Sequence, residues 1–406
     1  MKVAIIGGGA AGFFAAIHVK INYPLSEVVI LEKSKKILSK VKVSGGGRCN
    51  VTNACTDIKL LAENYPRGSK QLRKLFGFFS TADTMKWFED RGVQLVIQED
   101  DCVFPASQNS QTIIDCFLNE TRKLGVQIRM DAGVKSIYKN DSGGLITVLF
   151  DSGDLQNFDK VIVTTGGQPK REKYNWLEDP GHEIVEPIPS LFTFNMPDES
   201  IRELMGVVVE DAAVTIRSTK LKANGPLLIT HWGMSGPAIL KLSAFGARIL
   251  SEMNYDFYVH VNWLNIQNET EIKNNLDELL NNNGYKHISN VRFQQIPQRL
   301  WDYLLTKIEI PKDKPANQLN QKERNKLINI LSNDAYKVKG KTTFKEEFVT
   351  CGGVDLNDIS FKSMQSKKVK GLYFAGEVID VDGVTGGYNF QAAWTTAFIA
   401  AKLFED

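Results

Sequence analysis

Three glycines near the N-terminus have the spacing and setting of a dinucleotide-binding turn. Gly7, Gly9 and Gly12 follow the apolar run 3–6 and precede a helical pattern over 10–20. In such a turn the first glycine permits the tight bend, the second lets a pyrophosphate approach the backbone, and the third lets helix and strand pack closely. The helix N-terminus then offers N–H groups and a positive dipole end to the phosphates. The spacing therefore predicts a strand–turn–helix unit that binds phosphate.

An acidic residue stands where this kind of unit holds a ribose. Glu32 follows Gly12 by twenty residues and directly follows the apolar run 28–31, which predicts a second buried strand. A carboxylate at this position accepts hydrogen bonds from the adenosine ribose and repels a 2′-phosphate. We therefore expect a dinucleotide other than NADP at this site.

The segment 33–56 is polar and basic, with glycines at 45–47 followed by Arg48, Cys49, Asn50, Thr52 and Asn53. Backbone exposed by glycines beside cationic and amide side chains suits a phosphate or the edge of a flavin. A flexible surface loop is the alternative interpretation.

Two further apolar runs end in glycines. The run 161–163 leads into Thr165, Gly166 and Gly167, and the run 372–375 leads into Gly376 and Glu377. Carboxyl ends of parallel strands meet at one edge of a sheet, where ligands bind. After a glycine-rich loop, a helix is predicted to begin near Asn389. The chain thus ends as it begins, with a strand, a glycine turn and a helix.

The separation of the two glycine turns favours a flavin over a nicotinamide. More than three hundred residues divide them, whereas a nicotinamide dehydrogenase usually completes its binding domain in one stretch. The second helix start is predicted to face the flavin pyrimidine ring, where a positive dipole end favours reduction. A second strand-associated G-x-G-x-x-G is missing, so a dedicated nicotinamide domain is not expected.

The length of 406 residues indicates two or three domains. We predict an FAD-binding domain from 1–189 and 346–406, interrupted by an inserted domain at 190–345. The insertion should contain a barrel-like antiparallel part at 190–268 and a helical part at 269–335.

The net charge of +2 gives no argument for nucleic acid or membrane. The five cysteines are odd in number and lack metal-ligand spacing, which together with the missing secretory signal predicts a cytoplasmic protein without a metal site.

Several strings together resemble a known family. KVAIIGGGAAG, SGGGRCNVTN, THWGMSGPAILKLS, TCGGVDLNDI and GLYFAGEVIDVDGVTGGYNFQAAW are similar to the BaiN-like (YhiN-type) bacterial FAD-dependent oxidoreductases, over essentially the whole chain. The resemblance implies an α/β Rossmann-like fold of the two-dinucleotide-binding-domain flavoprotein type, with an inserted mainly antiparallel β domain and a small helical subdomain. Cys351 stands where the family pattern has alanine, and Cys102 where it has arginine.

The motifs and the resemblance together give one set of candidate FAD-binding residues. They are Gly7, Gly9, Ala10, Ala11, Gly12, Glu32, Lys33, Lys40, Ser44, Gly46, Gly47, Arg48, Cys49, Asn50, Thr52, Val134, Thr165, Gly166, Gly167, Gly376, Glu377, Asp380, Gly386, Gly387, Tyr388, Asn389 and Gln391.

The chemistry expected of such a protein is hydride transfer through flavin N5, with NAD(P)H or an organic substrate as donor and a small molecule as acceptor. Reduction of an enone and oxidation of an amine both fit.

His231, just before a glycine-rich turn, is the candidate acid–base residue; capping the helix that follows is its alternative role. Cys49 lacks a C-x-x-C partner, so a disulfide reductase is not expected. Asp380 and Asp382 are candidate paired acids; the favoured alternative is that one of them binds the ribityl chain or caps a turn. A flavin-binding protein with a structural or RNA-associated role is the competing hypothesis; it draws on lysines at 33–42 and 367–370, while the weak net charge argues against nucleic acid.

Overall fold

The computed structural model describes residues 1–139, 144–342 and 349–405. The chain divides into two compact units, of which each has its own hydrophobic core. Unit 1 consists of Met1–Ser190 and Lys345–Asp406, and unit 2 of Leu191–Phe344. Unit 2 is thus inserted between two parts of unit 1. No helix in the described ranges is both long and apolar enough to cross a bilayer.

Unit 1 contains eight α-helices in its described part. They are α1 (Ala10–Asn22), α2 (Ser39–Gly47), α3 (Ile58–Glu63), α4 (Ser69–Leu75), α5 (Thr81–Glu89), α6 (Gln111–Lys123), α7 (Asn175–Glu178) and α12 (Tyr388–Ala400). Its strands are β1 (Lys2–Ile6), β2 (Glu27–Leu31), β3 (Thr52–Asn53), β4 (Leu95–Ile97), β5 (Cys102–Pro105), β6 (Gln127–Arg129), β7 (Val134–Lys139), β8 (Ile146–Phe150), β9 (Leu155–Phe158), β10 (Lys160–Val163), β11 (Ile184–Pro189), β19 (Thr350–Val354), β20 (Ile359–Ser360), β21 (Gln365–Ser366) and β22 (Leu372–Phe374).

A parallel sheet organises unit 1. Its strand order is β20-β21-β22-β10-β1-β2-β6, and β22, β10, β1, β2 and β6 all run in one direction. The central strands are almost wholly apolar and buried, as expected of strands covered on both faces. Their common direction places the ends of β1, β2, β10 and β22 at one edge of the sheet. This arrangement confirms the predicted α/β class.

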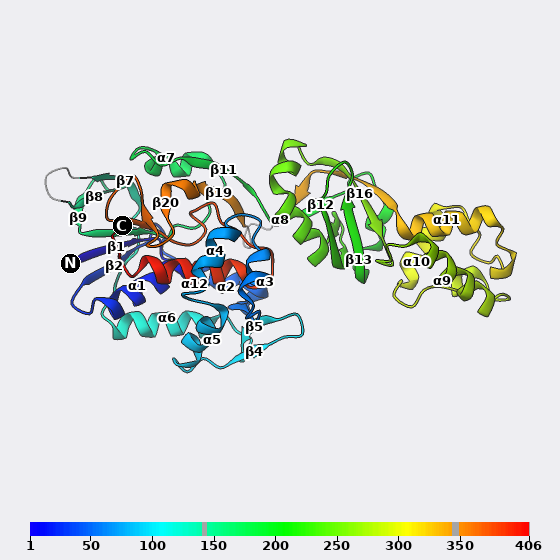
Figure 1. Cartoon of the computed structure of the whole chain (residues 1–406), viewed down its shortest axis with the longest axis horizontal. Coiled ribbons are helices and arrows are strands. Elements are labelled where there is room, and N and C mark those ends of the chain that lie inside the picture. The colour runs from blue at the N-terminus through cyan, green and yellow to red at the C-terminus, as the bar shows by residue number, and fades with distance from the viewer. Residues whose placement is uncertain (140–143, 343–348, 406) are drawn as a thin grey trace. The chain divides into compact units, whose positions relative to one another are not determined.

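Helices and a small sheet cover the two faces of the parallel sheet. Figure 1 shows α1, α12 and α6 on one side, with α1 and α12 adjacent although they come from opposite ends of the chain. The antiparallel sheet β7–β8–β9 lies on the other side. The short apolar runs and Asn/Asp/Gly turns that follow residue 126 predict an antiparallel meander of three strands, the first over 127–140. Residues 127–129 instead pair in parallel with β2, and the antiparallel part begins at Val134. The predicted turn at 140–144 lies largely outside the described residues.

The segment 33–56 is more ordered than a loop. Residues 39–43 form a helical turn, Ser44 is extended, and Gly45 and Gly46 then have left-handed φ values of 56° and 67°. The polar, basic composition of 33–56 predicts a loop throughout, and this prediction is wrong for residues 39–43. The helix escapes sequence inspection because its lysines and serine mask one buried apolar position, Val41.

Unit 2 combines an antiparallel sheet with two groups of helices. The helices are α8 (Pro237–Glu252), α9 (Glu269–Asn282), α10 (Gln298–Lys307) and α11 (Gln321–Ser332). The strands are β12 (Thr193–Asn195), β13 (Val208–Ile216), β14 (Lys222–Ile229), β15 (Gly233–Ser235), β16 (Asp256–Asn262), β17 (Asp334–Lys339) and β18 (Lys341–Thr342), in the order β17-β16-β13-β14-β15-β12-β18.

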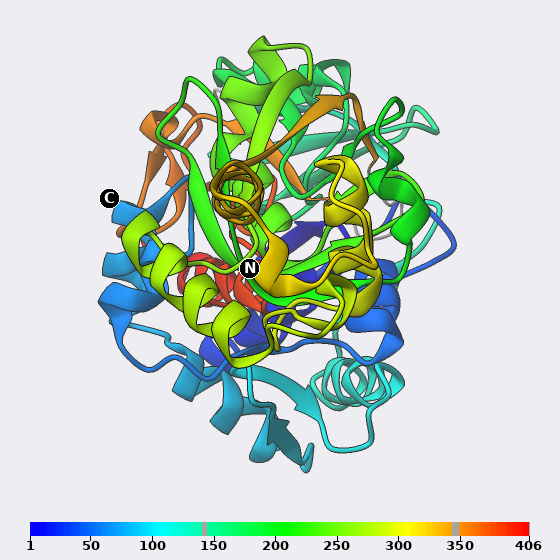
Figure 2. The ribbon, with the colours of Figure 1, turned by 90° about the vertical axis from the view of Figure 1, so that its right-hand side faces the viewer.

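The helices of unit 2 lie in two places. Helix α8 packs against β12, β13, β14 and β15, while α9, α10 and α11 form a cluster at the end of the sheet, facing the viewer in Figure 2. Leucine and isoleucine side chains of all four helices contribute to one core with the inward side chains of the sheet. The amphipathic pattern of the polar segment 269–335 is satisfied within this cluster.

Candidate functional site

The turn between β1 and α1 leaves its helix end open. Gly9 is the N-cap of α1, no side chain caps it, and the first turn carries no acidic residue. The first N–H groups of a helix have no partner within the helix. A Cβ added at Gly9 would meet no protein atom within 4 Å. The free N–H groups at the start of α1 therefore lie beside open space at Gly9, and the turn fits a pyrophosphate.

The other two glycines of the motif serve packing. A Cβ at Gly12 would lie 2.0 Å from the Gly7 carbonyl oxygen, and one at Gly7 would lie 2.6 Å from the Thr164 carbonyl oxygen. The Thr164 hydroxyl also donates to the Gly7 carbonyl at 2.9 Å. Gly7 and Gly12 thus let α1, β1 and β10 close together, whereas Gly9 faces free space.

Glu32 is held at the end of β2 by two backbone donors. Its Oε2 accepts from Gly8 N–H at 2.9 Å, and its Oε1 accepts from Ser34 N–H at 2.9 Å. Each carboxylate oxygen keeps a further lone pair for a ribose hydroxyl. Val134 begins β7 next to Gly133, whose added Cβ would lie 3.5 Å from the Lys33 Cβ. Val134 and Lys33 therefore lie near Glu32, although the Lys33 side chain is exposed.

The C-terminal glycine turn meets the N-terminal one. A Cβ added at Gly376 would lie 3.0 Å from the Ala11 Cβ, and Gly376 N–H donates to the Thr396 hydroxyl of α12 at 2.9 Å. Gly387 is the N-cap of α12, again without a side-chain cap. The two uncapped helix starts are thereby brought into one unit.

The segment that follows α2 docks on the start of α12. The Thr52 hydroxyl donates to Gln391 Oε1 at 2.6 Å, and Asn53 Nδ2 donates to the Gly386 carbonyl at 3.2 Å. A Cβ at Gly387 would overlap the Thr52 carbonyl at 2.3 Å. Neither hydrogen bond is foreseeable from the sequence, because the partners are more than three hundred residues apart.

Arg48 is fixed by its neighbours. Its guanidinium carbon lies 4.2 Å from the centroid of the Phe104 ring, and its Nε donates to the Gly45 carbonyl at 3.1 Å. A further bond joins Nη1 to Gln108 Oε1 at 3.3 Å. The stacked guanidinium is thus oriented before any ligand arrives, which is the arrangement expected of an anion-binding arginine.

The glycines after β10 approach Glu377. A Cβ at Gly167 would lie 2.9 Å from Glu377 Oε1, which accepts from Thr350 N–H at 2.9 Å, and Lys40 Nζ donates to Glu377 Oε2 at 2.8 Å. The Thr350 hydroxyl is buried without a hydrogen-bond partner in the described part of the chain. Sequence reasoning missed Thr350. A bound group or an ordered water would satisfy its hydroxyl.

A buried ion pair beside this turn also escaped the sequence analysis. Asp382 is fully buried and accepts hydrogen bonds from the Arg67 guanidinium and from the Ser190 hydroxyl. Burial raises the pKa of Asp382 to about 6, although Arg67 and Ser190 lower it. Asp380 instead accepts from Gly352 N–H at 2.8 Å. The two aspartates therefore have different hydrogen-bond partners, and the place of Asp380 in the cofactor site stays a prediction.

Most predicted cofactor residues lie around these turns of unit 1. Ala10, Thr165 and Asn389 are half-buried, and Asn389 accepts a hydrogen bond from Gly383 N–H. Ser44 donates to the Val41 carbonyl at 2.9 Å, and Gly47 accepts from Ser110 N–H at 2.9 Å. Gly46 and Gly166 have no protein atom within 4 Å of an added Cβ, and the Tyr388 carbonyl accepts from Tyr65 at 2.7 Å.

Two predicted residues stand apart. Burial raises the pKa of the Cys49 thiol to about 12, so it is a neutral thiol next to Arg48. His231 belongs to unit 2, on the exposed turn between β14 and β15, where its ring centroid lies 4.4 Å from that of Trp232. Its role as an acid–base residue remains a prediction.

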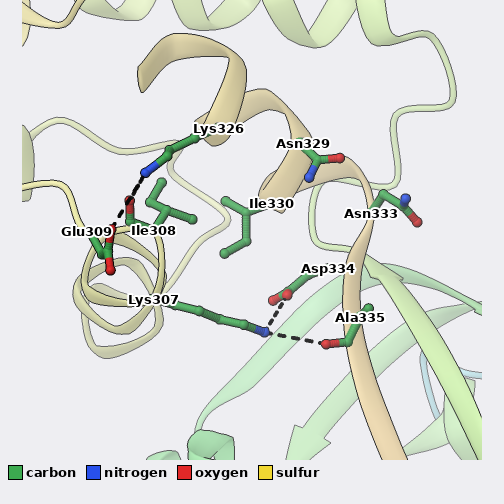
Figure 3. A pocket seen from close by; sticks show the side chains of 9 residues that line it. All are labelled: Lys307, Ile308, Glu309, Lys326, Asn329, Ile330, Asn333, Asp334 and Ala335. Carbon is green, nitrogen blue, oxygen red and sulfur yellow. Dashed lines mark hydrogen bonds and ion pairs between the residues drawn. The ribbon is translucent and has the colours of Figure 1, made fainter. Parts of the chain in front are cut away.

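A cavity of about 510 Å³ lies elsewhere, in the helical part of unit 2 (Figure 3). Its charged lining is paired internally: Lys307 Nζ donates to Asp334 Oδ1 at 2.6 Å, and Lys326 Nζ donates to the Ile308 carbonyl at 2.9 Å. Asp334 also accepts from Trp263 Nε1 at 3.0 Å. None of the predicted site residues lines this cavity.

Comparison with known proteins agrees with the geometry of unit 1. The profile of the HI0933-like protein Rossmann domain matches residues 1–403. The chain belongs to the HI0933-like family. The ribosomal RNA dihydrouridine synthase of Escherichia coli is 30% identical, covering 98% of this chain and 96% of that protein. The 3-dehydro-bile acid delta(4,6)-reductase of Clostridium scindens is 26% identical, covering 99% of this chain and 98% of that protein.

Solved structures share the fold over nearly the whole chain. The 3-ketosteroid-delta4-(5alpha)-dehydrogenase of Rhodococcus jostii superposes with a TM-score of 0.51 at 11% identity, covering 98% of this chain and 97% of that chain. The quinol fumarate reductase subunit of E. coli gives 0.51 at 12% identity, covering 99% and 69%. At these identities the likeness concerns the fold alone.

The family resemblance predicted from the motifs is confirmed, and so is the flavoprotein fold class. The chain is an FAD-dependent oxidoreductase of this family. Its substrate and its electron donor are matters for proposal.

Proposed function

We propose that this protein reduces a carbon–carbon double bond conjugated to a carbonyl group, and that its substrate is a uracil base in RNA. Bound FAD supplies a two-electron hydride donor for such a reaction. The substrate gains a hydride at the carbon remote from the carbonyl and a proton at the carbon next to it. NADH or NADPH is the proposed source of the electrons.

One observation carries this proposal. Two relatives that match nearly the whole chain are named for reactions that saturate a carbon–carbon double bond conjugated to a carbonyl group. Dihydrouridine is uridine whose C5=C6 bond, conjugated to the C4 carbonyl, is saturated. A 3-keto bile acid with double bonds at positions 4 and 6 presents a conjugated dienone. The shared electronic feature is a carbonyl that accepts charge when hydride adds.

The uracil base is favoured among these substrates because the E. coli relative, at 30% identity, and a second one from Haemophilus influenzae, at 27%, have the same name. These names support a nucleic acid as the binding partner, although the net charge of the chain is small. The reductase relative supports a free enone as the second candidate substrate.

Residues of both units have defined parts in this proposal. The open N-terminus of α1 at Gly9 would hold the pyrophosphate, Glu32 the ribose, and Arg48 an anionic or carbonyl group of the bound molecule. The uncapped start of α12 would stabilise negative charge that develops on the ring system. His231 is the proposed proton donor.

The proposal is tested by following the two halves of the reaction anaerobically. NADH or NADPH should bleach the flavin absorbance of the purified protein. Adding a uridine-containing ribosomal RNA transcript should restore the colour and raise the mass of one uridine by about two hydrogens, in line with the two-electron stoichiometry. If 2-cyclohexenone restores the colour and RNA does not, the free enone is the substrate class. If neither does, the reaction class is wrong.

A further inference from the structure

One face of the unit 2 sheet is left open. Along β16, the side chains of Phe257, Val259 and Val261 are buried, whereas Asp256 and Tyr258 point outward. The inward side chains form one core with residues of α8. On the outward face the Tyr258 ring remains 43% exposed. The ring contacts Lys337 on this face, and its exposed part is available to a partner.

The strand register gathers basic side chains around this ring. Tyr258 is paired with Lys337 of β17, and Asp256 is paired with Lys339. Arg217, at the end of β13, donates its N–H to the Tyr258 carbonyl at 3.0 Å. Lys222 begins β14 opposite Thr215 of β13, whose other neighbour is His260 of β16. Lys220 is exposed in the turn that joins β13 to β14. We call Arg217, Lys220, Lys222, Tyr258, Lys337 and Lys339 the Tyr258 patch.

The charge of the Tyr258 patch is not neutralised locally. Asp256 forms an ion pair with Lys337, whose Nζ also lies 4.6 Å from the centroid of the Tyr258 ring. Within the described residues, Arg217, Lys220, Lys222 and Lys339 have no carboxylate within 4.0 Å. Five cations thus face one acid, a local excess that the net charge of +2 for the whole chain conceals.

The lysines at 367–370 provide a contrast. Lys367 Nζ donates to the Asn357 carbonyl at 2.9 Å, Lys368 pairs with Asp358 at 3.2 Å, and Lys370 pairs with Glu405 at 2.9 Å. These three lysines therefore already have partners within the protein. The basic residues of the Tyr258 patch are scattered over 217–339 in the sequence, and only the register brings them together.

We propose that the Tyr258 patch binds single-stranded RNA. Unpaired lysine and arginine side chains attract the phosphate backbone, and an exposed aromatic ring on a sheet stacks with an unpaired base. The inference rests on the proposed function, since a uracil base must leave its helix to be reduced. The patch would bind the RNA substrate through its phosphates and one stacked base.

Fluorescence anisotropy of a 5′-labelled, single-stranded RNA 12-mer of mixed sequence tests the inference on the full-length holoprotein. The double variant Lys220→Ala/Lys222→Ala should weaken binding about tenfold at low salt and reduce the salt slope by about 1.4, which is two phosphate contacts. Tyr258→Ala should weaken binding at least about fivefold, because one stacked base is lost.

Matched controls lie in the helical part of unit 2. Tyr285 is 94% exposed, and Lys273 of α9 and Lys322 of α11 are exposed, so Tyr285→Ala and the double variant Lys273→Ala/Lys322→Ala make the same chemical changes elsewhere. These controls should bind RNA as the wild type does. Melting temperatures and flavin spectra of all variants should match those of the wild type.

Equal RNA affinity in wild type and patch variants would overturn the inference, as would an equal loss in the controls. Binding of phosphatidylglycerol vesicles that depends on the patch, without RNA binding, would assign the surface to membranes instead. If the protein reduces 2-cyclohexenone but the patch variants bind RNA as the wild type does, the inferred RNA-binding surface is refuted and the proposed reaction class is supported. If the patch variants lose RNA affinity but the wild type reduces no base, the RNA-binding surface is supported and the proposed reduction of uracil is refuted.

Discussion

Gly376 lies directly against Ala11, so closely that a Cβ added to Gly376 would be 3.0 Å from the Ala11 Cβ. This contact joins a turn from the last strand of the parallel sheet to the first helix of the chain. Because both helix starts in this region lack side-chain caps, the contact places two sets of unsatisfied backbone donors in one unit. The account of a single bound FAD depends on this proximity.

Removing Arg67 should destabilise unit 1. Arg67→Met leaves the fully buried Asp382 without its cation, and breaking a buried pair in this way costs about 3 kcal/mol. Adding Asp382→Asn to the same chain should recover most of the loss, since no buried charge is then left over. Urea unfolding at pH 7 measures both variants. A double variant as unstable as Arg67→Met alone would contradict this explanation.

Asp382 should also give the stability a pH dependence of a defined sign. Burial raises its pKa from 3.8 to about 6 in the folded protein, so between these values the folded state holds a proton that the unfolded chain has lost. The free energy of unfolding should therefore fall as the pH rises from about 4 to about 6. The difference between wild type and Asp382→Asn in urea unfolding isolates this contribution. A difference that stays constant over this range would refute it.

Cys49 should be unreactive in the folded protein. Because burial raises its pKa to about 12, almost no thiolate is present at pH 8. Iodoacetamide should first modify Cys55, which is half-buried, and reach Cys49 only after unfolding. Peptide mass spectrometry of the alkylated native protein reads this out. Native labelling of Cys49 at the rate of a free thiol would be inconsistent with the structure.

The proposed role of His231 predicts a split between the two half-reactions. His231→Gln should slow reduction of the substrate about a hundredfold, because a positioned proton donor is lost. Bleaching of the flavin by NADH or NADPH should not change. His287→Gln, which alters another exposed histidine of unit 2, is the matched control. Unchanged substrate reduction in His231→Gln would leave His231 with only a structural role.

Local signals predicted the parts of the fold that local chemistry determines. The strand–glycine–helix unit at 2–22, the acid after β2 and the C-terminal repeat of the pattern are each encoded within about thirty residues. The short helix α2 was missed because a single buried apolar residue, Val41, is too weak a periodic signal. Strand β6 was assigned to the wrong sheet, since pairing partners are not visible in a strand's own sequence.

The side-chain contacts of the site were beyond such reasoning. Asp382 was noticed as an acid, but its partner Arg67 lies 315 positions earlier and belongs to no motif. The same holds for Thr52 and Gln391. Their pairing follows from how α12 packs beside α1, which is a property of the assembled core and not of any window of sequence.

The most direct test compares FAD binding by wild type, Gly9→Val and Gly12→Val, starting from protein stripped of flavin. Gly9 has a φ of −93° and free space for a side chain, so Gly9→Val should melt like the wild type. Gly12→Val should fold poorly, because its Cβ would lie 2.0 Å from the Gly7 carbonyl oxygen. FAD at a hundred times its Kd should stabilise the wild type by about 2.7 kcal/mol. The account predicts no such gain for Gly9→Val; FAD binding by Gly9→Val as tight as by the wild type would contradict it.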